Sequence, residues 1–140
     1  MAPLSDDPGH WLRRLSPDQW IRAALGEIDR AKAAYVRGDA RAGAAGVKRA
    51  AGMALNAALI VERDDRWGRS YVEHVQALSV DAGVPEAVRA ACRAVLDAGG
   101  PGGEVIVLRT PRTGEAAIEA AKDVIAHAWA VVKRHEADAG

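Results

Sequence analysis

The chain has 140 residues, which is enough for one domain with a single core and too few for two. Hydrophobic residues make up 49% of it, but many are alanine, phenylalanine is missing and aromatic residues amount to 4%. Its 19 basic and 19 acidic residues balance, which excludes the strong overall field of many nucleic-acid-binding proteins and leaves only a local basic patch open.

The first predicted helix begins after Ser16. Ser16 is a suitable N-cap, Pro17 suits the first helical position, and Gln19 completes a capping box. Gly38 is expected to end this helix. Residues 1–15 are interpreted as an N-terminal arm that precedes the domain. The inner face of the helix is predicted from apolar residues at helical spacing: Ile21, Leu25, Ile28, Ala31 and Tyr35.

A second helix is predicted from Asp39, as its N-cap, to about Glu62. Gly43, Gly46 and Gly52 within it are poor helix formers, each costing about 1 kcal/mol relative to alanine. We interpret these glycines as a narrow face that another helix approaches closely. This helix is therefore expected to be the central helix of a bundle.

Two shorter helices are predicted next, one near residues 69–81 and one that starts at Pro85 and ends at residues 99–100. Cys92 shares the apolar face of the second of them, so we interpret it as a small core residue rather than a nucleophile. As the single cysteine, it excludes an intramolecular disulfide and fits a reducing cytoplasm. The residues of the 69–81 helix expected to face inward are Tyr71, Val75 and Leu78.

A Gly/Pro-rich loop is predicted over residues 99–111. Its apolar run E-V-I-V-L, residues 104–108, is too short and solitary for a sheet, so an extended segment over the bundle is expected. Thr113 is expected to cap the last helix. The sequence thus predicts one domain over residues 16–137, folded as an all-α, antiparallel up-and-down bundle of four to five helices.

No export or membrane segment is expected. The start M-A-P-L-S-D-D-P-G-H-W lacks a basic region followed by an apolar run. No apolar stretch approaches the roughly 18 residues that a membrane span needs. A cytoplasmic protein without membrane contact is therefore expected.

Three stretches carry a family resemblance. In residues 35–59, Y-V-R-G-D-A-R-A and onward, an Ala-rich helix follows a Gly-Asp turn. In residues 70–78, S-Y-V-E-H-V-Q-A-L, a turn that contains histidine opens a helix, and in residues 108–125 an Arg-x-Pro loop leads into a terminal Ala-rich helix. In these features the chain resembles the HEPN family, named for higher eukaryotes and prokaryotes nucleotide-binding, over roughly residues 17–135.

The resemblance implies a HEPN-like up-and-down bundle that is usually a dimer. The family includes RNase toxins and defence nucleases, inactive antitoxin or scaffold versions, and partners of minimal nucleotidyltransferases. It therefore implies a homodimer and, as further partners, a nucleotide, RNA, or a separate nucleotidyltransferase, toxin or antitoxin chain. No cofactor is implied.

Arg69 and His74 are the candidate catalytic residues. Catalytic HEPN members carry an arginine, commonly a polar residue directly after it, and a histidine separated from the arginine by four to six residues, and Arg69, Ser70 and His74 fit this pattern. In that metal-independent chemistry the histidine handles the proton of the RNA 2′-hydroxyl while the arginine stabilises phosphate charge. Inside a regular helix, however, a separation of five residues turns two side chains apart by about 140°. His74 also falls on the inward face, where a hydrogen-bonded core histidine is the alternative interpretation.

Arg109 and Arg112 flank a proline just before the last helix and form a candidate phosphate or nucleotide site. A helix N-terminus offers unpaired N–H groups and the positive end of the helix dipole. Arg89 and Arg93, one helical turn apart, are candidates to extend this site. The alternative is a solvated basic loop.

Asp123 and His127 lie one turn apart on the last helix, with Arg134 two turns beyond on the same side. An Asp-x3-His pair could orient an imidazole or supply two metal ligands, but no second pair with ligand spacing exists, so no metal site is predicted. Surface hydrogen bonding is the simpler interpretation. Tryptophans are enriched at interfaces, so one or two of those outside the apolar stripes could line a dimer interface: Trp11, Trp20, Trp67 and Trp129.

Three functional hypotheses follow. The first is a non-catalytic HEPN-like module that binds nucleotide, RNA or a partner protein, in a toxin–antitoxin or nucleotidyltransferase-associated system. The second is an RNase toxin that uses Arg69 and His74. The third is a helical bundle with a purely structural role.

Overall fold

The computed structural model describes residues 11–99 and 111–139, and every regular element in these two ranges is a helix. The predicted all-α bundle is confirmed. The helices, in chain order, are the 3₁₀ helix η1 (Trp11–Arg14), α1 (Pro17–Val36), α2 (Ala40–Val61), the 3₁₀ helix η2 (Asp65–Trp67), α3 (Tyr71–Ser79), α4 (Glu86–Asp97) and α5 (Pro111–Ala139).

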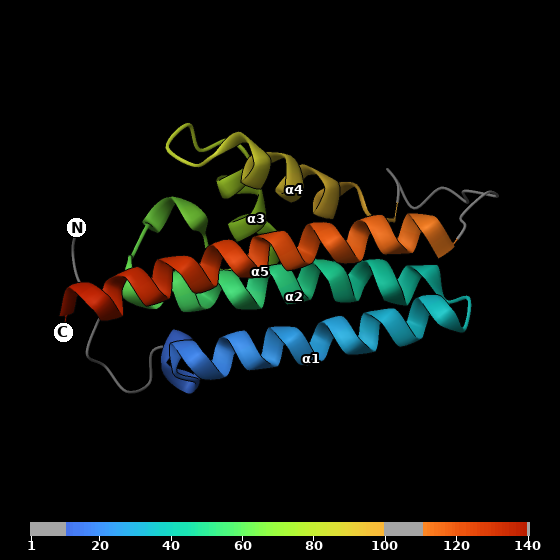
Figure 1. Cartoon of the computed structure of the whole chain (residues 1–140), viewed down its shortest axis with the longest axis horizontal. Coiled ribbons are helices and arrows are strands. Elements are labelled where there is room, and N and C mark those ends of the chain that lie inside the picture. Colours follow the sequence, from blue (N-terminus) through green and yellow to red (C-terminus); the bar gives the residue numbers. More distant parts are fainter. Residues whose placement is uncertain (1–10, 100–110, 140) are drawn as a thin grey trace.

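The three long helices α1, α2 and α5 lie side by side, and α3 and α4 pack over α2 and α5 (Figure 1). α1 runs antiparallel to both of its long neighbours, whereas α2 and α5 run in the same direction. The first turns of α2 and α5 both pack against Tyr35 of α1. A Cβ on Gly43 in α2 or on Gly114 in α5 would lie 2.7 Å from the Tyr35 ring. At their ends, His135 contacts Glu62, with Nε2 and a carboxylate oxygen 2.9 Å apart. Successive helices therefore run in opposite directions in the pairs α1–α2 and α4–α5, whereas α5 runs parallel to its neighbour α2.

The predicted boundaries of α1 and α2 are confirmed. Ser16 Oγ accepts a hydrogen bond from the Gln19 N–H at 3.1 Å, and the Ser16 N–H donates back to Gln19 Oε1 at 2.8 Å, which completes the capping box. Gly38 follows α1 with a φ of +85°, a left-handed conformation that favours glycine. Asp39 then caps α2 by accepting from the Ala42 N–H at 3.0 Å.

Three later boundaries differ from the prediction. α3 is shorter than residues 69–81, because Ser70 and Glu73 form a second capping box that starts it at Tyr71, and it ends at Ser79. Pro85 is the residue before α4 rather than its first residue. Thr113 lies inside α5 and does not cap it, because Pro111 already starts the helix, a position at which the missing N–H costs nothing. The predicted extended run at 104–108 lies outside the described residues.

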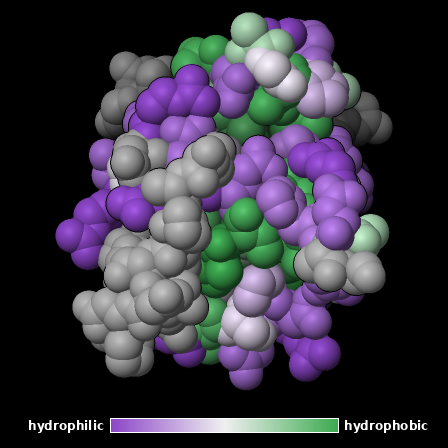
Figure 2. Space-filling view, turned by 90° about the vertical axis from the view of Figure 1, so that its left-hand side faces the viewer, coloured by the Kyte–Doolittle hydropathy of each residue, from purple (hydrophilic) through white to green (hydrophobic). Residues whose placement is uncertain are grey.

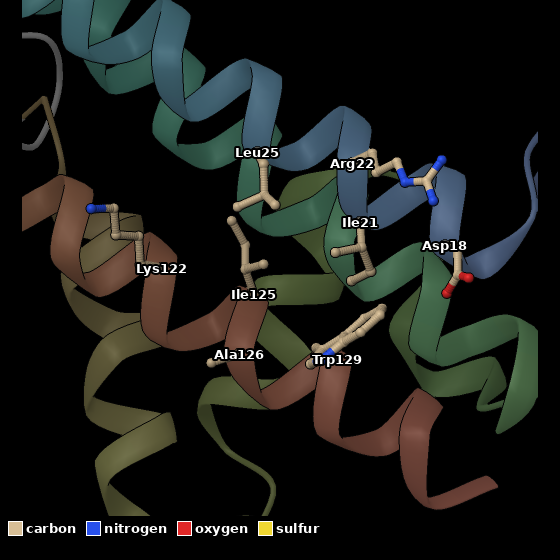
Figure 3. A pocket seen from close by; sticks show the side chains of 8 residues that line it. All are labelled: Asp18, Ile21, Arg22, Leu25, Lys122, Ile125, Ala126 and Trp129. Carbon is tan, nitrogen blue, oxygen red and sulfur yellow. The ribbon is translucent and has the colours of Figure 1, made fainter. Parts of the chain in front are cut away.

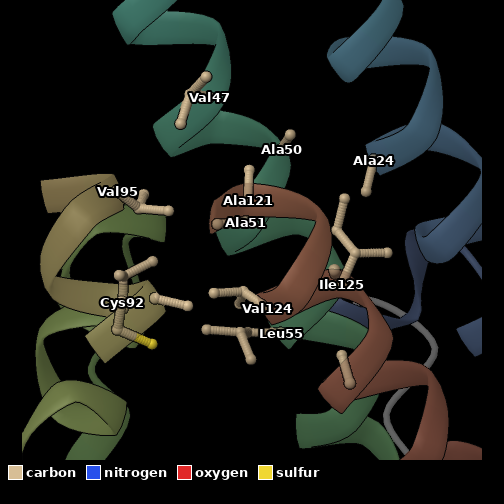
Figure 4. Packing of buried hydrophobic residues seen from close by; sticks show 14 of the residues in the cluster. Ala24, Val47, Ala50, Ala51, Leu55, Cys92, Val95, Ala121, Val124 and Ile125 are labelled. Atoms are coloured by element: carbon tan, nitrogen blue, oxygen red, sulfur yellow. The ribbon is translucent and has the colours of Figure 1, made fainter. Parts of the chain in front are cut away.

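The glycines of α2 allow the close approach that the sequence predicted. A Cβ on Gly46 would lie 3.0 Å from the Cβ of Ala31 in α1, and one on Gly52 would lie 2.5 Å from the Cα of Tyr71. Small side chains continue this pattern where α2 meets α5, at Ala50, Ala51 and Ala121 (Figure 4). Larger side chains fill the adjoining space, among them Val47, Leu55, Cys92, Val95, Val124 and Ile125.

The prediction was wrong for one core residue of α1. Leu25 is 47% exposed, while Ile21, Ile28 and Ala31 are buried as predicted. The helix turns a slightly different face inward, with Trp20 and Ala24 in the core instead. Part of the predicted N-terminal arm also contributes, since Leu12 is buried and its carbonyl accepts a hydrogen bond from Trp20 Nε1 at 2.9 Å.

Contrary to the expectation from the sequence, α2 is long and apolar enough, by length and composition alone, to cross a membrane. It is also the central helix, in contact with α1, α3, α4 and α5, and 67% of its most apolar window is buried inside the protein. Its composition is therefore explained by its place in the core. Figure 2 shows one end of the bundle, where apolar residues appear in narrow strips between hydrophilic ones.

Candidate functional site

His74 lies fully inside the protein, on α3. Its Nδ1 is 2.8 Å from the backbone carbonyl oxygen of Trp67, and its Nε2 is 2.8 Å from Oδ1 of Asn56 on α2. The ring has no exposed surface. Nε2 therefore joins α3 to α2 and Nδ1 joins α3 to η2, and no substrate reaches either nitrogen in this conformation.

The neighbours of His74 define its protonation. Burial lowers its pKa, and the hydrogen bond to Trp67 and the charge of Glu73 offset this only in part. The neutral ring carries its hydrogen on Nδ1, because the Trp67 carbonyl can only accept. Nε2 then needs a donor, and a half-turn of the Asn56 amide supplies one. That rotation also gives a partner to Asn56 Nδ2, which otherwise has none among the described residues.

Arg69 lies on the surface, in the turn before the Ser70 cap of α3. Its backbone lies against the Glu73 carboxylate, which helps to hold the pKa of Glu73 below its ordinary range after the larger effect of Ser70. The side chain of Arg69 is exposed while that of His74 is enclosed. The structure therefore does not bring the two candidate catalytic residues together in an open cleft.

The predicted phosphate site is described only in part. Arg109 and the side chain of Arg112 lie outside the described residues. Arg89 and Arg93 both pair with Glu86 on the same helix, at 3.0 Å and 2.6 Å. One carboxylate thus offsets part of the positive charge that this face of α4 would offer to a phosphate.

A polar cleft of about 400 Å³ opens where α2 ends against α5 and the α3–α4 connection. Two of the three residues that the sequence grouped on the last helix, His127 and Arg134, line it, while Asp123 is exposed elsewhere on α5. The other charged residues of the cleft come from three separate segments: Glu62, Asp64, Arg66 and Asp81. Its apolar floor includes Ala58, Trp67, Leu78 and Val131.

Ion pairs already neutralise much of the charge in this polar cleft. Arg66 holds Asp64 at 2.6 Å and lies 3.8 Å from Asp81, and Arg134 lies 3.8 Å from Glu62. Burial and the charge of Arg134 lower the pKa of His127, against the opposing charges of Glu62 and Asp81. The neutral imidazole of His127 can donate and accept, which makes the cleft suited to a polar ligand of mixed charge.

The sequence grouped His127 with Arg134 because both lie on one face of a helix. The carboxylates opposite them were not predicted, because they lie on connections that come close to α5 only in the folded chain. Asn56 was missed for a different reason: it is a single polar residue in an apolar helix, and such a residue is itself a signal of a buried hydrogen bond. Within the described ranges, no three His, Cys, Asp or Glu residues are arranged to hold a metal ion.

Cys92 is enclosed in the core beneath α4. Burial raises the pKa of its thiol to about 11, against the opposing charge of Arg93. The thiol therefore stays protonated at neutral pH, as expected for a core residue.

Comparison of the chain with protein-family models, curated proteins and solved structures finds no match. The assignment of a function therefore rests on the residues and their geometry.

Proposed function

We propose that this chain is a non-catalytic, HEPN-like helical-bundle module that acts in the cytoplasm by binding a partner protein, in a toxin–antitoxin or nucleotidyltransferase-associated system. The observation that carries the proposal is the enclosure of His74. A nuclease of the expected type needs this ring as a proton acceptor beside the RNA, whereas both of its nitrogens are engaged within the fold.

The charge of the surface favours a partner protein over a nucleotide or RNA. In the polar cleft three carboxylates, Glu62, Asp64 and Asp81, stand against two arginines that are already paired with them, so the cleft offers little net positive charge to a phosphate group. Arg89 and Arg93 share the carboxylate of Glu86. A protein segment that carries both charges and hydrogen-bonding groups suits such a cleft better than a polyanion does.

Incubation of the purified protein with RNA in EDTA tests whether the module is catalytic. We expect no cleavage by the wild type. Arg69→Ala is the informative variant, because Arg69 is exposed and its loss leaves the core intact. Cleavage by the wild type that Arg69→Ala abolishes, with an unchanged thermal unfolding curve, would establish the RNase alternative and overturn the proposal.

Binding is tested by calorimetry with the protein encoded beside this chain's gene. We expect His127→Ala to weaken the complex by about tenfold or more, the effect of losing one well-placed polar contact. Asp123→Ala is the matched control, because Asp123 lies one turn away on α5 and outside the cleft. ATP and a single-stranded RNA serve as competing ligands. A thermal shift with either that Arg89→Ala removes would replace the partner protein by a phosphate ligand.

A further inference from the structure

The polar cleft has an apolar floor beneath its charged walls. Ala58, Leu78 and Val131 form much of this floor, and Trp67 borders it with 8% of its surface exposed. At about 400 Å³ the cleft is large enough to enclose a whole side chain of another molecule. An amphipathic side chain, with an apolar stem and a polar end, matches such a lining best.

Two carboxylates in the walls have capacity to bind a ligand. Glu62, at the end of α2, contacts His135 at 2.9 Å and Arg134 at 3.8 Å through the same oxygen, Oε2. Asp81, after α3, accepts a hydrogen bond from a backbone N–H at 2.9 Å through Oδ1, while its Oδ2 lies 3.8 Å from Arg66. A carboxylate has about four lone-pair positions, so both groups can accept further hydrogen bonds.

The third carboxylate, that of Asp64, is already saturated by Arg66. It accepts from Nε through both oxygens, from Nη2, and from the backbone N–H of Arg66, all at 2.6–3.2 Å. Arg66 thus neutralises Asp64 and contacts Asp81 only at the edge of ion-pair distance. With His127 neutral, three carboxylates and two arginines give the lining a net charge of −1. The cleft therefore attracts a cation rather than an anion.

His127 faces the same space from α5. Its ring is close enough for the charges of Glu62 and Asp81 to act on its pKa, and no described residue forms a hydrogen bond with it. Burial, together with the charge of Arg134, nevertheless keeps that pKa below its ordinary value. The neutral ring has one nitrogen that can only accept a hydrogen bond. That nitrogen is a third acceptor for a cation in the cleft.

We propose that the polar cleft takes one basic side chain, a lysine or an arginine, from the partner protein. Its cationic end donates hydrogen bonds to Glu62, Asp81 and the accepting nitrogen of His127, and its aliphatic stem covers the apolar floor. A metal ion fits less well, because no three His, Cys, Asp or Glu residues in the described ranges are arranged to hold one. This inference rests on the proposed function, since it names the chemistry of the segment that binds.

A groove between α1 and α5 has the opposite charge and provides an internal comparison (Figure 3). Its volume is similar, about 380 Å³, but Asp18 is opposed there by Arg22 and Lys122, which gives its lining a net charge of +1. The ammonium of Lys133 already lies 4.1 Å from the centre of the Trp129 ring, which lines this groove. A basic ligand that its charge draws to the polar cleft should therefore avoid Trp129.

Nitrogen NMR of the full chain, titrated with small analogues of the basic side chains, tests the proposal. The probes are butylguanidinium and butylammonium, and pentanoate is their anionic counterpart. We expect either cation to shift the signals of the Trp67 indole and the His127 ring saturably, with a dissociation constant on the order of millimolar. The Trp129 indole signal should stay unchanged. Absence of saturable shifts with both cations, equal shifts at Trp129, or equally tight binding of pentanoate would overturn the proposal.

Asp81→Asn tests the role of the carboxylate itself. The variant keeps an oxygen for the Gly83 N–H and loses only the charge, so the fold should be preserved. Binding of the cations should weaken about tenfold. Asp123→Asn is the matched control, because it changes the net charge equally at an exposed position outside the cleft. Equal effects of the two variants would show that the cation does not meet Asp81 and would contradict the proposed contact.

Calorimetry with the partner protein separates this inference from the proposed function. If His127→Ala weakens that complex but neither cation binds the cleft, the function stands and the basic side chain is overturned. If a cation binds the cleft but His127→Ala leaves the complex unchanged, the cation site stands and the partner protein as its source is overturned.

Discussion

The ring of His74 and the amide of Asn56 meet in the core, with Nε2 2.8 Å from the nearer polar atom of the amide. Both side chains are completely buried, and they join the central helix α2 to the short helix α3. The second ring nitrogen binds the backbone at Trp67, just before α3. One histidine thus fixes the position of α3 and of the turn that precedes it.

The buried ring makes the stability of the protein depend on pH. Burial lowers the pKa of His74 in the folded state, so the unfolded chain takes up the proton first as pH falls. The contribution of His74 to the free energy of unfolding is therefore expected to have its full value above the ordinary histidine pKa of about 6.5. It should decrease as pH falls below that value. Urea denaturation at a series of pH values measures this. His74→Gln should reduce the slope, leaving the contribution of His127, whose pKa burial also lowers.

His74→Ala should destabilise the fold strongly. It leaves a cavity and removes the partner of two buried polar groups, so a loss of about 3–5 kcal/mol is expected in the free energy of unfolding. Arg69→Ala, on the surface, should change it by less than about 0.5 kcal/mol. Equal effects of the two variants would contradict the core position of His74.

Gly52→Ala should also be severely destabilising. The added Cβ would overlap the Cβ of Tyr71 and lie 2.5 Å from its Cα, so backbone as well as side chain must move. A loss of about 3 kcal/mol is expected. Gly26→Ala, also inside a long helix, meets only the end of Arg30 at 3.9 Å and should stabilise by about 0.5–1 kcal/mol. A Gly52→Ala variant as stable as the wild type would contradict the close approach of α3 to α2.

Glu27 joins α1 to α2 through a nearly buried carboxylate. It contacts Arg30 at 2.7 Å and Arg49 at 2.8 Å. Burial opposes its ionisation, but the two arginines outweigh this and lower its pKa. The stability that ionised Glu27 contributes is thus fully present above the unfolded glutamate pKa of about 4.3. It is lost as pH falls through the lower pKa that Glu27 has in the folded state. Glu27→Gln should cost about 1–3 kcal/mol at neutral pH, and Glu136→Gln, in an exposed pair with Lys133, should cost about 0.5 kcal/mol or less.

Cys92 should resist alkylation in the native protein. Its enclosed thiol has a pKa of about 11, so little thiolate is present at neutral pH. Labelling by iodoacetamide, followed by mass spectrometry, should be slow in buffer and fast in urea. Rapid labelling of the folded protein would contradict the core interpretation.

Local signals predicted the fold where the chain makes its own boundaries. The caps at Ser16 and Asp39 and the turn at Gly38 depend on residues within one helical turn of one another, so they could be recognised directly. Leu25 could not be placed, because Ile21 and Ala24 fit the same helical spacing and only the neighbouring helix decides which of them is covered. The parallel course of α2 and α5 likewise depends on how the intervening helices return the chain.

The candidate site was predictable to a similar degree. The spacing of Arg69 and His74 indicated a nuclease pattern, and the inward position of His74 already offered the core alternative that the structure supports. The polar cleft could not be predicted as a whole, because Glu62 and Asp81 lie on segments far apart in the chain and only the packing of α5 brings them near His127.

The most direct test of a non-catalytic role is the titration of His74 itself, followed by nitrogen NMR of the imidazole. A ring committed to the fold should stay neutral, with its hydrogen on Nδ1, as pH falls past the ordinary histidine pKa of about 6.5, because burial lowers its pKa. A ring that takes up a proton near the ordinary pKa of about 6.5, with the protein still folded, would show it to be accessible for proton transfer and would contradict the account.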